Sequence, residues 1–237
     1  MIFLGTLVNA AAIVAGGLLG RLLTRIPESI RQTVMQGIGL AVILLGLQMG
    51  LETKNFLIVI ISIVAGTIIG ELLGVEKGLN LAGKWLESKV GNNRQGSVAA
   101  GFVTATLVYC VGAMSVLGSL DSGLRNNHDI LFTKSLLDGF SAIIFTSTLG
   151  IGVLFSAIPV LLYQGGLVLL STQIYNLLSP EMLDAILVEV TATGGVLIVA
   201  IGLNILELTK TKVANMLPAL VIAAVAVPVF EKLSGLV

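Results

Sequence analysis

The sequence predicts an all-α membrane protein, a polytopic bundle of about eight transmembrane helices. Hydrophobic residues make up 56% of the 237 residues and charged residues only 11%, whereas soluble domains carry roughly 25% charged residues. The charges are separated by long uncharged runs, and a helix needs about 20 apolar residues to cross the hydrocarbon core. These runs lack the alternating pattern of barrel strands, so helices are the expected spanning structure.

The uncharged runs give the predicted spans in order. They cover residues 1–20, 32–51, 55–70, 95–120, 139–180, 190–206 and 213–230. The fifth run is long enough for two crossings, with a turn predicted at Ser156-Ala157-Ile158-Pro159 because proline disfavours a helical conformation in the residue before it. The runs 55–70 and 190–206 are short, so each is predicted to draw a neighbouring acid, Glu71 or Glu189, into the membrane.

The whole chain, residues 1–237, is predicted to be one integral membrane domain. Between the third and fourth spans, residues 75–92 place apolar side chains at helical spacing with lysines elsewhere, which predicts an amphipathic helix at the membrane interface. Nine Lys and Arg residues fall in odd-numbered loops against four in even-numbered loops and termini. This bias predicts cytoplasmic odd loops and both termini outside. No basic region precedes the first apolar run, so a cleaved signal is not expected.

A possible internal repeat pairs helices one to three with helices six to eight. Gly16-Gly17 aligns with Gly165-Gly166, and Pro27-Glu28 aligns with Pro180-Glu181. A displacement of five helices would place the two copies in opposite orientations, which is the inverted repeat of secondary transporters with their discontinuous helices. Chance alignment of apolar helices is an equally good explanation.

The composition excludes several classes of function. The chain has one cysteine, Cys110, and one histidine, His128, so neither a disulfide framework nor a Cys/His metal site is expected. The motifs HExxH, GxSxG and the Walker P-loop are absent from the sequence. We therefore expect no enzyme, no catalytic residues and no cofactor. Net charge is zero without a basic block, so nucleic acid is not an expected partner.

Glu189 is the first candidate for binding a substrate or ion. An acid inside a bilayer is costly and usually faces a cavity or a partner. It is followed by Thr191, Thr193, Gly194 and Gly195, and the glycine pair can loosen a helix and expose carbonyl groups to a ligand. The alternative is an interfacial glutamate beside glycines that serve close packing.

Asp138 is the second candidate, at the predicted start of helix five. Lys134 lies four residues before it, so an ion pair on one helix face is the competing explanation. Thr104 and Thr106 lie in a mildly polar helix four, where Gly112 is suited to a kink. Asn9 and Asn204 are buried amides that either bind ligand or join helices through hydrogen bonds.

Several segments resemble the YqgA/YdfK-like family of bacterial multi-pass membrane proteins of unknown function. They are Gly5-Thr-Leu-Val-Asn9, Cys110-Val-Gly-Ala-Met114, Lys134-Ser-Leu-Leu-Asp138-Gly139, Thr191-Ala-Thr-Gly-Gly195 and Ala214-Asn-Met-Leu-Pro218. The resemblance covers nearly the whole chain and implies a location in the bacterial inner or plasma membrane. Ala113 stands where many relatives have proline, which argues against a rigid break in helix four.

These observations favour a secondary transporter of a small solute or ion, coupled to a proton or cation. In this interpretation Glu189 or Asp138 takes up the coupling ion, and threonines and glycines of helices four and seven line the path. The alternative is an ion channel or a non-transporting membrane scaffold. Glycine-rich faces are suited to a homodimer and equally to packing within one subunit.

Overall fold

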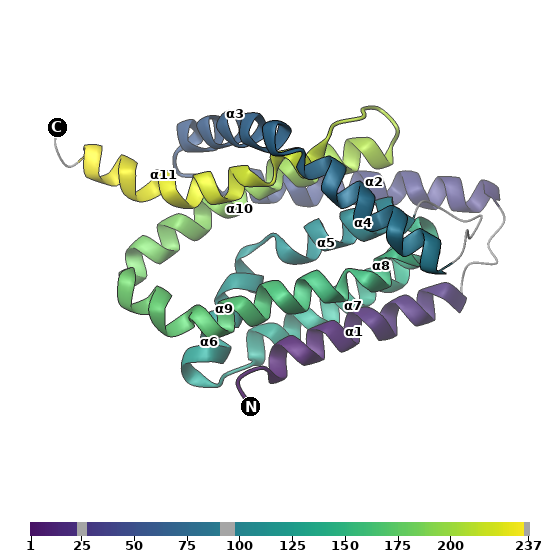
Figure 1. Cartoon of the computed structure of the whole chain (residues 1–237), viewed down its shortest axis with the longest axis horizontal. Coiled ribbons are helices and arrows are strands. Elements are labelled where there is room, and N and C mark those ends of the chain that lie inside the picture. Colours follow the sequence, from purple (N-terminus) through teal and green to yellow (C-terminus); the bar gives the residue numbers. More distant parts are fainter. Residues whose placement is uncertain (23–27, 91–97, 235–237) are drawn as a thin grey trace. The chain divides into compact units, whose positions relative to one another are not determined.

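The computed structural model describes residues 1–22, 28–90 and 98–234, and these residues are almost entirely helical. Figure 1 shows the helices along the chain. They are α1 (Leu4–Leu22), α2 (Glu28–Gly50), α3 (Phe56–Leu73), α4 (Val75–Val90), α5 (Val98–Cys110), α6 (Ala113–Arg125), α7 (Asp129–Leu149), α8 (Gly152–Phe155), α9 (Ala157–Leu177), α10 (Pro180–Ile205), the 3-10 helix η1 (Val213–Met216) and α11 (Pro218–Ser234). The all-α fold class is thereby confirmed.

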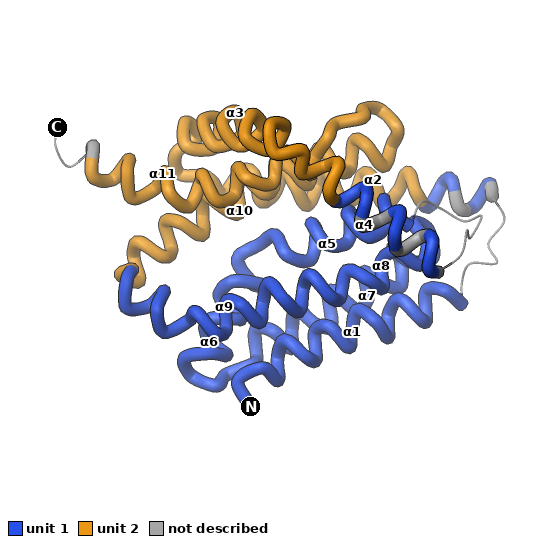
Figure 2. Tube along the Cα trace, viewed as in Figure 1, with its two compact units in different colours: residues 1–34, 79–177 blue, residues 35–78, 178–237 orange. Residues whose placement is uncertain are grey.

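The chain divides into two compact units (Figure 2). Unit 1 comprises residues 1–34 and 79–177, and unit 2 comprises residues 35–78 and 178–237. α2 and α4 each contribute residues to both units. Unit 1 therefore contains α1 and α5 to α9, whereas unit 2 contains α3, α10, η1 and α11.

Glycines allow α1 and α7 to pack closely and in parallel within unit 1. A Cβ atom on Gly5 would lie 2.9 Å from the Leu131 Cβ atom, Gly16 packs on the Gly139 carbonyl group, and Gly20 packs on Ile143. Residue numbers rise together along the two helices, so both run in the same direction. Such small-residue contacts are a common way for membrane helices to approach each other.

α5 and α6 form one broken span. The two helices meet at a bend of 63°, where Gly112 has φ 129° and ψ 149°, a conformation that is essentially restricted to glycine. Gly101 of α5 lies against Leu149 at the end of α7, and Gly118 of α6 lies against Ile130 and Leu131 at the start of α7. The pair thus runs antiparallel to most of α7 and is not a loop that returns to the side it came from.

Unit 2 is built from antiparallel pairs with glycine contacts. Gly46 and Gly39 of α2 pack on Gly195 and Gly202 of α10, respectively. In the second pair, Gly66 of α3 packs on Ala219, and Gly70 packs on the Asn215 carbonyl group. The opposite face of α3 exposes Leu57, Ile61, Val64, Ile68 and Leu72, as expected for a helix that faces lipid chains.

The helix directions agree with eight crossings. Among the described residues, seven helical segments are long and apolar enough to span a membrane, and the bent α5–α6 pair makes an eighth if it is counted as one span. If that pair counts as a crossing, α1 and α7 are the first and fifth spans and must be parallel, and α3 and α11 are the third and eighth spans and must be antiparallel. The glycine contacts show these same directions. The predicted double crossing of residues 139–180 is also present, as α7 and the α8–α9 segment.

Three predicted boundaries were wrong. The turn between the fifth and sixth spans falls at Gly150, with φ 89°, rather than at Ser156–Pro159. Pro159 lies in the first turn of α9, where its missing N–H group has no intrahelical partner to lose. α7 begins at Asp129 and α10 at Pro180, where the Ser179 hydroxyl caps the helix through the Met182 amide. Asp138 and Glu189 consequently lie further inside their helices than predicted.

Two expectations about helix breaks were also wrong. The Ala113 substitution does not remove the break in helix four, because Gly112 provides it, and Ala113 becomes the first residue of α6, a position that proline also favours. Conversely, α10 continues uninterrupted through Gly194-Gly195. The inverted repeat is not established and stays a prediction.

Candidate functional site

A buried charge network lies in unit 1 near the middle of α7. Asp138 is only 5% exposed, and Lys134 is 7% exposed. The Lys134 Nζ atom lies 3.0 Å from both Asp138 carboxylate oxygens. Asn9 of α1, which is fully buried, donates from Nδ2 to Asp138 Oδ2 at 3.0 Å. The ion pair that the four-residue spacing makes available is therefore present, and an amide from a second helix completes it.

The break between α5 and α6 lies beside this network. Cys110, the last residue of α5, is close enough to interact electrostatically with both Lys134 and Asp138. The neighbouring Tyr109 interacts in the same way with Asp138, and its ring stacks on Phe145 of α7 with centroids 6.1 Å apart. Gly112 offers no side chain to cap the first turn of α6, so the amide groups of that turn lack a side-chain acceptor from the N-cap residue.

Unit 1 also contains polar atoms without a hydrogen-bond partner. Among the described residues, eight buried side-chain atoms have none, and six of them belong to unit 1: the hydroxyls of Thr6, Thr106, Tyr109 and Thr146 and the amide oxygens of Asn9 and Gln164. Gln164 of α9 donates from Nε2 to Ser115 Oγ in the first turn of α6, at 3.1 Å. Because buried polar groups are normally paired, this set is suited to water, an ion or a polar solute.

Glu189 occupies a different environment, in unit 2. Its Oε1 atom accepts hydrogen bonds from the backbone amides of Lys54 and Asn55, both at 2.9 Å, and Oε2 accepts from Thr53 Oγ1 at 2.6 Å. Asn55 is itself the N-cap of α3. The carboxylate thus fixes the loop between α2 and α3 onto α10. A half-open cavity of about 230 Å³ adjoins it, lined in part by Lys54, Phe230 and Glu231.

The other predicted residues of unit 2 have packing or loop contacts. Gly195 packs on α2 next to Gly194. Thr191 and Thr193 are buried, and the Thr193 hydroxyl lacks a partner. Asn204 closes the loop after α10 through bonds to Thr209 and Thr211.

In unit 1, Thr104 and Thr106 of α5 are both partly buried, and the Thr106 hydroxyl belongs to the unpartnered set. The structure therefore brings Asp138, Asn9 and Thr106 into one unit and the Glu189 group into the other. Sequence reasoning missed Thr6 and Thr146 as members of the polar interior. Thr6 lies three residues before Asn9, and that spacing places both on one helix face.

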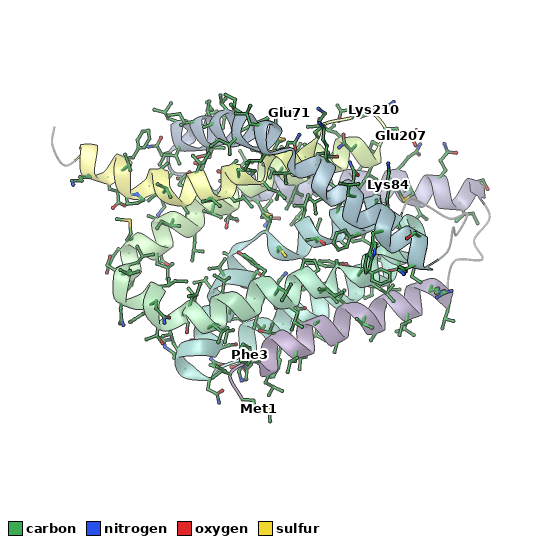
Figure 3. All side chains as sticks on the ribbon, in the orientation of Figure 1. Met1, Phe3, Glu71, Lys84, Glu207 and Lys210 are labelled. Atoms are coloured by element: carbon green, nitrogen blue, oxygen red, sulfur yellow. The ribbon has the colours of Figure 1, made fainter. Side chains whose placement is uncertain are left out.

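Charged residues also gather at one end of unit 2, around the loop between α10 and η1. Glu71 lies in the last turn of α3, and Figure 3 labels it together with Glu207 and Lys210 of that loop. Lys212 Nζ lies 2.6 Å from Glu71 Oε1. This hydrogen bond raises the pKa of Lys212 above its ordinary value. Both side chains are more than half exposed, so the pair lies outside the buried interior.

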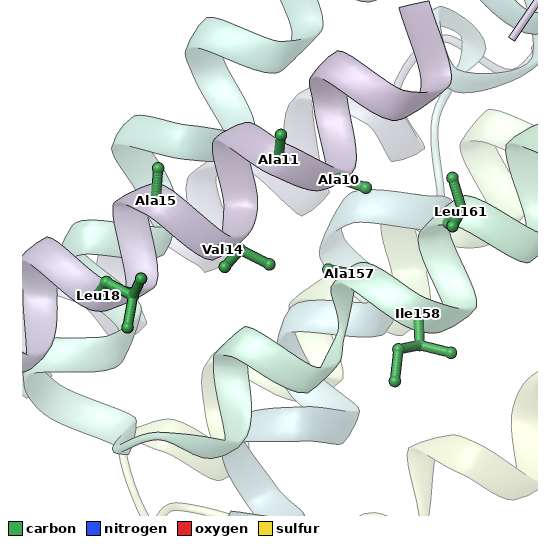
Figure 4. Close-up of a pocket in the computed structure, with 8 residues that line it drawn as sticks. All are labelled: Ala10, Ala11, Val14, Ala15, Leu18, Ala157, Ile158 and Leu161. Atoms are coloured by element: carbon green, nitrogen blue, oxygen red, sulfur yellow. The ribbon is translucent and has the colours of Figure 1, made fainter. Parts of the chain in front are cut away.

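An apolar groove of about 450 Å³ runs between α1 and α9 (Figure 4). Ala10, Val14 and Leu18 line one wall, and Ala157 and Ile158 line the other. It offers no side-chain hydrogen-bonding group, so it is not a site for a polar solute.

The chain matches the family described as "Protein of unknown function (DUF554)" over residues 4–228. It is 30% identical over 229 residues to the uncharacterised membrane protein YdfK of Bacillus subtilis (strain 168), covering 94% of this chain and 95% of YdfK. It is 33% identical over 225 residues to the uncharacterised protein YqgA of Escherichia coli (strain K12), covering 93% and 94% of the two chains. No solved structure matches. The chain is thus a multi-pass membrane protein that belongs to the DUF554 family.

Proposed function

We propose that this protein is a secondary, ion-coupled transporter of a small solute or ion in the bacterial plasma membrane. The observation that carries the proposal is the buried Lys134–Asp138–Asn9 network beside the break in the α5–α6 span. Discontinuous helices next to intramembrane charges form the substrate and coupling-ion sites of many transporters. In this proposal Asp138 takes up the coupling ion.

The cost of burying these polar and charged groups favours a transporter over a scaffold. Ionisable groups inside a bilayer are expensive and are retained mainly where they serve function. An ion pair can often be replaced by apolar residues without loss of stability, and the six unpartnered polar atoms of unit 1 add no hydrogen bonds of their own. A scaffold would gain nothing from these groups, whereas a transporter needs them to bind and release its solute.

Flux measurements on the reconstituted protein test this function. Proteoliposomes containing a pH-sensitive dye are exposed to gradients of sulfate, succinate, glutamate, arginine, sodium and potassium. A transporter coupled to protons gives a saturable pH change with at least one solute. We expect Asp138→Asn to abolish it. Asp121→Asn is the matched control, because Asp121 also forms an i,i+4 pair in the same unit, with the exposed Arg125 side chain. An unsaturable conductance would indicate a channel, and a complete absence of flux would indicate a scaffold.

The proposed orientation has its own test. The charge bias places the loop before α7 outside and the loop after α10 in the cytoplasm. In a Cys110→Ala background, a membrane-impermeant maleimide applied to intact cells should label Asn127→Cys and leave Lys210→Cys unlabelled. The opposite pattern would reverse the orientation without changing the number of crossings.

A further inference from the structure

We propose, building on the transporter function above, that the solute is a small anion, either a carboxylate or an inorganic oxyanion. The anion takes the place of the Asp138 carboxylate on the Lys134 ammonium group when Asp138 takes up a proton. The site is the interior of unit 1 at the break between α5 and α6.

The buried Lys134 ammonium group requires a counter-ion. Its side chain is buried, and the only hydrogen-bond acceptors it meets among the described residues are the two Asp138 oxygens. An ammonium group without a partner is very costly in a medium of low dielectric constant. Whenever Asp138 becomes neutral, Lys134 must therefore bind another anion or lose its own proton.

Asp138 is the carboxylate that controls the exchange of counter-ions on Lys134. α8 carries no ionisable side chain, and α1 carries Arg21 in its last turn. The titratable groups on the other elements around α7 are Tyr109 and Cys110 of α5, Asp121 and Arg125 of α6, which pair with each other, His128, which bonds to Ser122, Asp129 at the start of α7, and Tyr163 and Tyr175 of α9. Among the described residues, Asp138 is the acid that is bonded to Lys134.

The groups around Lys134 and Asp138 can accept an anion. The unpartnered hydroxyl of Tyr109, which interacts electrostatically with Asp138, is an available donor, and that of Thr6 lies one helical turn before Asn9 on α1. The first turn of α6 begins three residues after Cys110 and has no side-chain cap, and helix N-termini favour negative charge through their free amide groups. These features complement an anion, in addition to the charge of Lys134.

The resulting cycle is balanced. A proton from the aqueous phase on one side binds to an Asp138 oxygen, and a monovalent anion binds to Lys134. Both are released on the other side, after which the ion pair forms again. No covalent bond of the solute is made or broken, and a monovalent anion would move with one proton without net charge.

Binding of sulfate and succinate to the detergent-purified protein tests the proposal, with thermal stability as the signal. The wild type should bind more weakly as the pH rises from 6.5 to 9, approaching a tenfold loss per pH unit because one proton is taken up with each anion. Asp138→Asn mimics the protonated acid, so its affinity should be independent of pH and at least tenfold higher than the wild-type affinity at pH 8.5. The double variant Lys134→Gln/Asp138→Asn should lose binding.

The double variant also corrects for general stabilisation by sulfate, which acts on any folded protein. Equal stabilisation of Asp138→Asn and the double variant would overturn the proposal, as would wild-type binding that does not depend on pH, or no binding. If Asp138→Asn fails to fold, the wild-type pH dependence decides. Coupled flux of a cation without anion binding would refute this inference and leave the transporter function standing. Anion binding without flux would leave the anion site standing and refute the transporter function.

Discussion

Replacing Glu189 distinguishes a residue that holds the fold from one that binds a coupling ion. The carboxylate accepts two backbone amides and one hydroxyl from the loop before α3, and Glu189 is 3% exposed. We compare two substitutions. Glu189→Gln keeps an oxygen acceptor for the amides of Lys54 and Asn55, and its new amide group can donate to the Thr53 hydroxyl. Glu189→Ala removes all three acceptor contacts.

The structure gives the size of both effects. An amide left unsatisfied after such a truncation costs about 1–3 kcal/mol. In Glu189→Ala the Asn55 amide keeps the Thr53 hydroxyl as an acceptor at 3.2 Å, so the Lys54 amide alone is left without its partner. We therefore expect a loss of about 2–3 kcal/mol, because the adjoining cavity also lets water reach part of the site. Glu189→Gln exchanges hydrogen bonds to a charged group for neutral ones, a net loss of about 1 kcal/mol. For a chain of this size each kcal/mol corresponds to about 2–4 °C in Tm.

Thermal unfolding in detergent and flux in proteoliposomes are measured on both variants. We expect a clear loss of Tm for Glu189→Ala, a small one for Glu189→Gln, and coupled flux retained in Glu189→Gln. If Glu189→Gln keeps the wild-type Tm but loses flux, Glu189 binds the coupling ion, as its choice as the first candidate from the sequence implies. That result would refute the assignment of Glu189 to loop positioning.

Three further predictions concern the break, the glycine contacts and pH. Gly112→Ala should lower stability by about 1–3 kcal/mol because of its backbone conformation, whereas Gly166→Ala, which has open space around it, should be neutral or stabilising; equal Tm values would refute the strain argument. Gly70→Ala should destabilise because its Cβ would strike the Asn215 carbonyl group, whereas Gly37→Ala would meet nothing, as denaturant unfolding can check. Because the pKa of Lys212 is raised above 10.5, the contribution of the Lys212–Glu71 pair to the free energy of unfolding should be constant at neutral pH and should be lost only above about pH 10.5. The difference in Tm between the wild type and Lys212→Met, measured from pH 7 to 11.5, should shrink only in that alkaline range.

The spans were predictable from the sequence because the membrane imposes a length on every apolar run. The uncharged runs coincide with the seven candidate spans and the bent α5–α6 pair of the described residues, and the 42 residues from 139 to 180 were correctly assigned to two spans. The exact ends were not predictable by the same argument. Charged or polar first turns, such as Asp129 to Lys134 in α7, interrupt the uncharged run without interrupting the helix, since intrahelical bonding does not depend on side-chain charge.

The roles of the two acids depended on contacts that no local pattern contains. Glu189 meets residues that lie 134 to 136 positions away in the sequence, and Asn9 meets Asp138 across 129 positions. The glycine pair beside Glu189 suggested an opened helix, yet α10 is continuous there because Gly195 serves contact with α2. The true break needed only Gly112, whose missing side chain permits a backbone that other residues avoid.

The distribution of hydrogen bonds explains why Asp138, rather than Glu189, is the better candidate for exchange. Glu189 is bonded to two backbone amides, whose positions are fixed by the chain, so releasing it would require the start of α3 to rearrange. Asp138 is bonded to two side chains, Lys134 and Asn9, which can change partners by rotating. The unpartnered Tyr109 hydroxyl interacts electrostatically with Asp138, and the Asn9 amide that is bonded to Asp138 has a free oxygen. A carboxylate held by side chains can therefore bind and release a proton during transport, while a carboxylate held by backbone amides keeps a loop in place.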